Sequence, residues 1–201
     1  RSSEESCQAA CRASLSMFQQ LQRLNTHRAI ENSDPIKMAF GVHTGEITAG
    51  VIQPDDSFEY IFCGEAMDKV EFCKGVGKEY ISETFILVSD VCHEMISSKF
   101  MFRELDKVSG ENYDAVRLFE LLGESKTDLD PIKGKACNHY REGLGHYKAR
   151  RWRIASEHFK KAWEVNFDKP GHMLYNRCKG YVESPLNAPM EDWDGSIHLD
   201  I

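Results

Sequence analysis

The amino-acid sequence predicts an α+β fold for residues 1–122, a charged linker over residues 123–135 and a helical unit over residues 136–201. Apolar residues alternate with other residues through Ile36–Val42, which is the period of a β-strand. Phe85–Val88 is a compact apolar run with the length of a buried strand. Helices and strands in the order found here predict a largely antiparallel sheet with helices covering one face.

The N-terminal segment predicts one helix followed by three strands. A narrow apolar stripe indicates an amphipathic helix over residues 6–25, and its members are Ala10, Ser14, Met17, Leu21 and Leu24. Residues 36–42 form the first expected strand. Residues 47–51 alternate again after a tight turn, so these two strands are expected to pair as a hairpin. Tyr60–Cys63 is a third, short apolar strand.

The rest of the first domain predicts two helices and three strands. Ser89 is expected to cap the second of these helices, because its hydroxyl can accept a hydrogen bond from a free backbone N–H. The expected elements are a helix over residues 65–78, a strand over 85–88, a helix over 90–96, and strands over 102–108 and 115–122.

Residues 136–201 predict a pair of helices followed by a third helix over residues 171–182 and an extended tail. One pattern in this segment resembles a single tetratricopeptide repeat (TPR) with a shortened turn, and its residues are Tyr140, Tyr147, Ala155, Phe159, Ala162 and Pro170. A single repeat cannot bury its own apolar face. We therefore expect this TPR-like unit to pack on the sheet domain or on a protein partner.

Composition excludes several classes of protein. A formal net charge of -7 argues against binding to nucleic acid, and the absence of a long apolar run argues against a membrane span. Seven cysteines without a Cys-x-x-Cys pair indicate free, mostly buried thiols in a reducing, cytoplasmic compartment. No metal is expected at Cys7 and Cys11 or at Asp55 and Asp56. Because the chain opens with Arg1 and no signal peptide follows, we expect it to be an interior segment of a longer protein.

Several segments together resemble one protein family. Ile36–Glu46, Ala49–Ile52, Glu59–Met67 and Ile86–Ser89 are similar, in the same order, to segments of class III adenylyl and guanylyl cyclases. The resemblance covers residues 6–122 and implies the C-terminal half of a ferredoxin-like cyclase homology domain. The helical segment, which ends in Trp193-Asp194-Gly195, resembles the C-terminal extension of many microbial cyclase domains.

The resemblance implies a dimer of two cyclase-like domains with active sites at their interface. In the family, two aspartates that bind metal come from the first half of the domain, which precedes the segment found here. We therefore expect no metal or other cofactor on this chain alone, and Mg²⁺ or Mn²⁺ only if the missing half completes the site. The expected partner is another cyclase-like domain or the upstream half of the same protein.

Four positions that carry family roles are occupied by unsuitable residues. Ile61 stands where a polar residue selects the purine, and an isoleucine cannot hydrogen-bond a base edge. Asp68 and Phe72 stand where an asparagine and an arginine stabilise the transition state. Ser109 stands where a lysine binds phosphate. No catalytic or nucleotide-binding residue is therefore expected to function, whereas Phe72 is expected in the core with Val76 and His43 is expected to be structural.

Three functions remain open on this basis. The first is a degenerate cyclase domain, inactive alone, that serves as a regulatory or assembly module in cyclic-nucleotide signalling. The second is the metal-supplying half of a pseudoheterodimeric cyclase that converts ATP or GTP. The third is a structural scaffold that binds a partner through residues 136–201. In each case we expect another polypeptide to complete the sheet at the strands Ile36–Val42 or Ala115–Leu122, because unpaired strand edges attract other chains.

Overall fold

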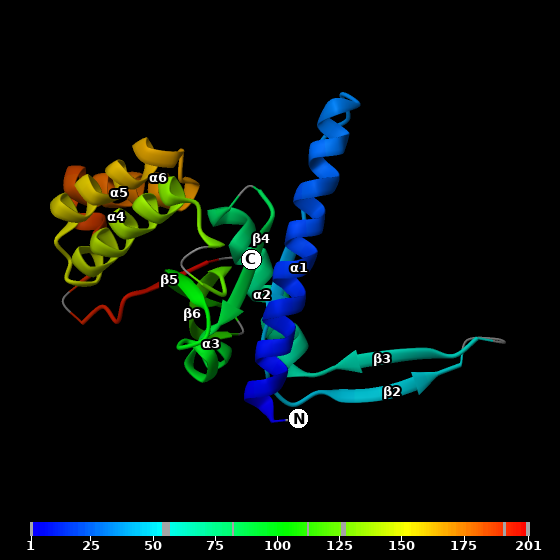
Figure 1. The fold of residues 1–201 in the computed structure, drawn as a ribbon. Coiled ribbons are helices and arrows are strands. Elements are labelled where there is room, and N and C mark those ends of the chain that lie inside the picture. Colours follow the sequence, from blue (N-terminus) through cyan, green and yellow to red (C-terminus); the bar gives the residue numbers. More distant parts are fainter. Residues whose placement is uncertain are drawn as a thin grey trace.

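The structure is a computed structural model that describes residues 2–53, 57–81, 83–111, 113–125, 128–190 and 192–199. Figure 1 shows a sheet domain with a long N-terminal helix on one side and a separate group of helices on the other. The elements are α1 (Ser3–Ile30), β1 (Ala39–Val42), β2 (Thr48–Ile52), β3 (Glu59–Cys63), α2 (Glu65–Tyr80), β4 (Phe85–Ser89), α3 (Asp90–Ile96), β5 (Met101–Gly110), β6 (Tyr113–Gly123), α4 (Pro131–Lys148), α5 (Trp152–Asn166), α6 (Lys169–Glu183), a 3₁₀ turn (Pro185–Asn187) and β7 (Ser196–His198).

The central sheet has five strands in the order β1-β4-β6-β5-β7. Strand β6 pairs in antiparallel fashion with β4 and β5, whereas β1 runs parallel to β4 and β7 runs parallel to β5. The expectation of a largely antiparallel sheet is therefore wrong for two of these four pairings. The chain between β1 and β4 contains α2, and a connection of this kind returns the second strand in the same direction as the first. The expected open edge at Ala115–Leu122 is also wrong, since β6 has a strand on each side.

Strands β2 and β3 form their own two-stranded sheet, which projects away from the rest of the molecule (Figure 1). They pair in antiparallel fashion, with Thr48 opposite Cys63 and Ile52 opposite Glu59. The expected hairpin between residues 36–42 and 47–51 is therefore wrong. The first of these segments pairs with β4 in the buried sheet instead, and the second continues outward to meet β3.

Helices cover both faces of the central sheet, not one face as expected. All five residues of β4 are buried, and successive side chains of a strand point to opposite faces. Phe85 and Leu87 pack in a cluster with Val76 of α2. Ile86 and Val88 belong to a second cluster on the other face, whose helical members are Cys7, Cys11, Cys92 and Ile96 of α1 and α3.

Helix α1 buries a stripe that agrees with the expected one at Ser14 and Leu21 and differs from it elsewhere. A capping box between Ser2 and Glu5 starts this helix, which runs five residues beyond the expected end at Asn25. Its buried residues are Cys7, Cys11, Ser14 and Leu21. Ala10, Met17 and Leu24 of the expected stripe are exposed, so the cysteines and not these residues face the sheet. No helix in the described part of the chain is long and apolar enough to cross a membrane.

Helices α4, α5 and α6 form a compact three-helix unit with a core of its own. Its buried residues are Tyr140, Leu144, Tyr147, Ala155, Phe159, Ala162, Leu174 and Cys178. Gly143 lets α4 and α5 approach closely, because a Cβ atom there would lie 2.9 Å from Cδ1 of Phe159. After α6 the chain returns to the sheet, where β7 pairs with β5 and Leu199 donates a backbone hydrogen bond to the Ser109 carbonyl at 2.9 Å.

Candidate functional site

The four positions singled out by the cyclase resemblance do not converge in one polar pocket. Ile61 lies on the projecting hairpin, opposite Gly50, and is 41% exposed. Asp68 is exposed in the first turn of α2, and Phe72 lies one turn further along the same helix with 6% exposure. Ser109 lies near the end of β5. The structure brings Phe72 close to the end of β5 and leaves Ile61 on the hairpin.

Phe72 is a core residue, as expected. Its ring stacks on that of Tyr113, with centroids 4.6 Å apart and planes inclined by 20°. A Cβ atom at Gly110 would lie 2.8 Å from Cε2 of Phe72, so only glycine admits this contact without a shift. Phe72 also belongs to the same buried cluster as Val76. The α2 position where the family carries an arginine is therefore filled by an aromatic stack that closes the β5–β6 turn against α2.

A groove beside this stack carries mostly negative charge. The groove lies between the first turns of α2 and the β5–β6 turn and is lined by Glu65, Lys69, Gly110, Glu111, Tyr113 and Asp114. Three carboxylates thus face one ammonium group, and Lys69 already lies 4.0 Å from Glu65. Like charges repel, so this groove disfavours a triphosphate.

Ser109 is half-buried and lies next to the C-terminal strand. The hydroxyl oxygen of Ser109 lies 3.4 Å from Nδ1 of His198, and the backbone of Ser109 pairs with β7. His43 is also satisfied within the fold, because its Nδ1 lies 2.8 Å from the hydroxyl of Ser89. Burial lowers the pKa of the His43 imidazole, and the nearby Lys69 lowers it further. Ser89 also accepts a hydrogen bond from the Cys92 backbone N–H and so caps α3, as expected.

Strand β5 carries two buried charged networks that hold the three-helix unit against the sheet. In the first, the Arg103 guanidinium donates to Asp168 Oδ1 at 2.6 Å and to the Glu120 carboxylate, and Lys133 lies 3.4 Å from Glu120. Burial by itself lowers the pKa of Arg103, but Glu120 and Asp168 outweigh it and raise the pKa above its ordinary value. Asp168 also caps α6 by accepting from the Gly171 N–H.

The second network is centred on Asp106. The Tyr80 hydroxyl of α2 and the Arg177 guanidinium of α6 both donate to Asp106 Oδ2 at 2.5 Å. Arg177 also donates to the Tyr147 hydroxyl at 3.0 Å. Burial raises the pKa of the Tyr80 and Tyr147 phenols well above their ordinary range. One strand thus joins α2, α4 and α6 through groups shielded from water.

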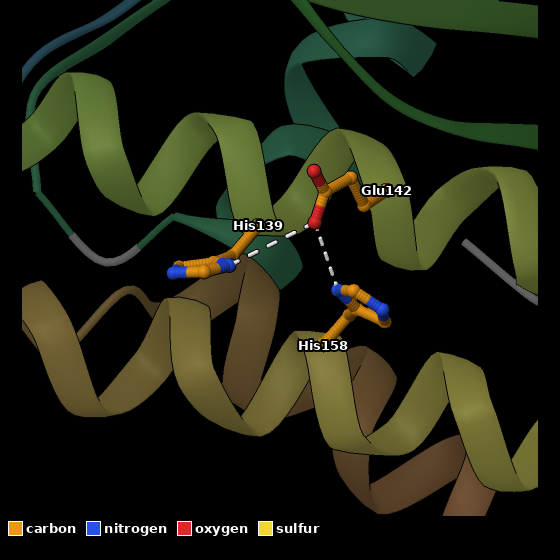
Figure 2. A group of neighbouring side chains, drawn as sticks. All are labelled: His139, Glu142 and His158. Atoms are coloured by element: carbon orange, nitrogen blue, oxygen red, sulfur yellow. Dashed lines mark ion pairs between the residues drawn. The ribbon is translucent and has the colours of Figure 1, made fainter.

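A third polar group lies within the three-helix unit and was missed by the sequence analysis. Figure 2 shows His139 and Glu142 on α4 facing His158 on α5. Glu142 Oε2 lies 3.0 Å from Nδ1 of His158 and 3.9 Å from Nδ1 of His139. The spacing His-x-x-Glu was a visible signal, because residues three apart share a helix face, but the third member lies on another helix. Across the described residues, this is where three candidate metal ligands gather.

The described sheet residues do not form a site that could hold a divalent cation by protein ligands alone. No three histidine, cysteine or acidic side chains gather closely in the described part of the sheet domain. Mg²⁺ in proteins is usually held by one or two carboxylates together with phosphate oxygens of the substrate. Asp55 and Asp56, from which no metal was expected, lie outside the described residues.

No protein-family model matches the chain, and no curated protein sequence matches it either. Two solved structures share its fold. The adenylyl cyclase CyaB from P. aeruginosa matches with a TM-score of 0.54 and 17% identity over 65% of each chain. The guanylyl cyclase Cya2 matches with a TM-score of 0.51 and 20% identity over 58% of this chain and 59% of that one. The chain thus spans less than two thirds of either structure, and the expected resemblance is confirmed for the fold.

Proposed function

Starting from this cyclase-type fold, we propose that the chain is a degenerate class III cyclase homology domain that acts as an assembly or regulatory module in cyclic-nucleotide signalling. Its role is to pair with another cyclase-like domain, either the upstream part of the same protein or a second polypeptide. The observation that carries the proposal is the hairpin β2–β3, which projects from the rest of the molecule (Figure 1). Its apolar side chains are exposed to solvent.

Several large apolar side chains of the hairpin are exposed to solvent. The exposed apolar side chains of the hairpin and of the residues next to its strands include Ile47 (51%), Val51 (53%), Phe58 (69%), Tyr60 (75%) and Phe62 (54%). A contiguous exposed apolar surface typically marks an interaction site. Strand β1 adds a second feature, since among the described residues it pairs only with β4 and leaves its other edge open. A second domain that covers the hairpin and the β1 edge would bury both.

The proposed loss of catalysis rests on the residues found at the positions that the cyclase resemblance assigns to catalysis. Removing one preorganised donor from a site that stabilises developing charge costs about 10²–10³ in rate. Here Asp68 carries the wrong charge, Phe72 is buried under the β5–β6 turn, and Ser109 is an uncharged residue paired with β7. Mg²⁺ or Mn²⁺ would bind only in a site that the missing half completes, because the resemblance places the metal-binding aspartates in the half that precedes this segment.

We also propose the domain limits given by the sequence, with residues 1–122 as the cyclase-like domain, 123–135 as a linker and 136–201 as a TPR-like extension. The separate core of α4–α6 supports a distinct helical unit. The limits themselves differ in detail from the elements, because α4 begins at Pro131 and β7 pairs with β5 in the sheet. The buried contacts of Arg103 with Asp168 and of Asp106 with Arg177 favour an extension that is fastened to the sheet. They disfavour a scaffold in which this extension binds a partner as an independent arm.

The experiment combines assembly and activity. Sedimentation velocity of the purified chain should show a dimer formed through the hairpin, because a second copy is the one cyclase-like domain in the preparation that can cover it. Tyr60→Glu should weaken this dimer at least tenfold, because a carboxylate would replace an apolar contact. Leu186→Glu is the matched control, since Leu186 is 100% exposed on the 3₁₀ turn outside the hairpin. A compact monomer at high concentration, or equal effects of the two variants, would contradict the pairing role.

The same preparations should make no cyclic nucleotide from ATP or GTP with Mg²⁺ or Mn²⁺. The triple variant Asp68→Asn, Phe72→Arg, Ser109→Lys should also stay inactive alone, because the metal ligands lie outside this chain. Turnover by the unmodified chain would overturn the assignment as a degenerate domain. Turnover by the triple variant alone would overturn the placement of the metal ligands.

A further inference from the structure

Two histidine rings in the three-helix unit face one carboxylate from neighbouring helices. His139 and Glu142 lie one turn apart on α4, and His158 reaches toward them from α5 (Figure 2). One nitrogen of each ring and one oxygen of Glu142 all lie within 4.8 Å of one another. The three side chains are partly shielded, with 26%, 57% and 23% exposure for His139, Glu142 and His158.

The ring nitrogens at the centre of this group have no hydrogen-bond partner. Nδ1 of His139 and Nδ1 of His158 are both buried and make no hydrogen bond within the described structure. His158 Nδ1 lies only 3.0 Å from Glu142 Oε2, yet the ring is not oriented to donate to it. Most buried polar side-chain atoms in folded proteins have a partner, so two orphaned nitrogens at one point require an explanation.

A single metal ion between these atoms would supply the missing partner for both nitrogens and a counter-charge for the Glu142 carboxylate. Zn²⁺ binds imidazole nitrogen and carboxylate oxygen at about 2.0–2.2 Å in tetrahedral geometry, which places neighbouring ligand atoms about 3.4 Å apart. The observed separations from Glu142 Oε2, 3.0 and 3.9 Å, lie on either side of that value. The two histidine nitrogens also lie within 4.8 Å of each other.

The packing around the group holds the ligands in place. Gly143 and Phe159, the residues that follow Glu142 and His158, make the close contact between α4 and α5. Tyr140 packs its ring edge against Phe159, with centroids 5.1 Å apart. A ligand set carried on two well-packed helices is better ordered than one carried on loops. The ring of His146 also stacks against that of His158, with centroids 5.4 Å apart, and adds an imidazole next to the three ligands.

We propose that His139, Glu142 and His158 form a binding site for a divalent first-row transition ion, of which Zn²⁺ is the type, with a fourth position open to water or to an external ligand. Two imidazoles and one carboxylate suit Zn²⁺, Cu²⁺ and Ni²⁺, whereas Mg²⁺ and Ca²⁺ prefer oxygen ligands alone. The site belongs to the helical extension and is separate from the metal that a cyclase partner would bring. A bound ion would tie α4 to α5 at a point between their ends.

The test is a titration of Zn²⁺ into the full chain after removal of metal with a chelator, followed by calorimetry. One ion should bind per chain, and excess Mg²⁺ should not displace it. His139→Ala and His158→Ala should each weaken binding by at least about 100-fold, because even a group that only supports a ligand costs 10- to 100-fold when lost. His172→Ala is the matched control, since this histidine lies on α6 beside Asn176 and should leave the affinity unchanged.

Two further measurements do not depend on whether a variant folds. Co²⁺ added to the unmodified chain should give the visible absorption of a four-coordinate nitrogen and oxygen site, without a thiolate band. Zn²⁺ should raise the Tm of the unmodified chain and of His172→Ala, because an ion that binds only the folded state stabilises it. The proposal is overturned if His158→Ala binds Zn²⁺ as tightly as the unmodified chain. It is also overturned if Cys63→Ser removes the binding, or if the Co²⁺ spectrum shows thiolate ligands.

Discussion

Replacing Arg103 by methionine should destabilise the fold more than replacing an exposed arginine. Arg103 is the cation between two carboxylates, Glu120 of β6 and Asp168 at the start of α6. The three side chains are only 2%, 10% and 1% exposed. Methionine fills a similar volume without charge, so Arg103→Met leaves both carboxylates buried with Lys133 as their remaining cation.

The magnitude follows from the burial of the pair. Breaking a buried ion pair by removing one partner costs about 3–5 kcal/mol, because the other charge stays uncompensated in a medium that solvates it poorly. Native domains are stable by only about 5–15 kcal/mol. For a chain of about 200 residues, each kcal/mol shifts the Tm by about 2–4 °C. The expected decrease in Tm is therefore about 6–20 °C.

The assay is thermal unfolding followed by circular dichroism, with urea unfolding as a second measurement. Arg12→Met is the matched control, because Arg12 pairs with Glu124 at the surface, where the side chains are 52% and 45% exposed. Exposed pairs contribute about 0–1 kcal/mol, so this control should lower the Tm by only a few degrees. The double variant Arg103→Met, Glu120→Leu should have a higher Tm than Arg103→Met alone, since it removes one of the two buried carboxylates left without Arg103. A loss below about 1 kcal/mol for Arg103→Met would refute the reasoning.

Two other predictions concern thiols and pH. Iodoacetamide at mildly alkaline pH should alkylate Cys63 long before Cys11 or Cys73. Cys63 is exposed, whereas burial raises the pKa of the other two thiols to about 12. Equal labelling rates of the three cysteines in peptide mass mapping would contradict this prediction. The free energy of unfolding should fall as pH is lowered from about 7.5 to about 5, because burial lowers the pKa of His43 and His93 below 6.5 and the unfolded chain therefore takes up protons first. Urea unfolding should show a flatter pH dependence for the double variant His43→Gln, His93→Phe, and an unchanged dependence would refute this assignment.

The order and type of most elements were predictable, because each depends on residues close together in the chain. Ser89 caps α3 and β4 follows an apolar run, as expected from their local patterns. Pairing was harder to predict. Whether residues 39–42 pair with β2 or with β4 depends on contacts across more than 40 residues. The turn that follows residues 39–42 did not indicate that the chain would return through α2 to place β4 beside them.

In the candidate site, too, contacts between residues close in the sequence were predictable, and contacts between distant segments were not. Phe72 and Val76 lie one turn apart on α2, so their shared face was predictable, and they do pack in one cluster. The stack of Phe72 on Tyr113 was not, because Tyr113 comes from β6. Likewise, His139 and Glu142 share a helix face that the sequence shows, but His158 joins them only through the packing of α5 on α4.

The sequence by itself determined the α+β character of the first domain and the presence of a helical extension. Tertiary structure decided that the sheet is mixed, that helices cover both of its faces and that β7 closes the β5 edge. Tertiary structure also decided which charged side chains pair, above all Arg103 with Asp168, which lie 65 residues apart in the sequence. The physical reason is that helix and strand periods are set by neighbouring residues, whereas buried charges are tolerated only where distant segments bring them a partner.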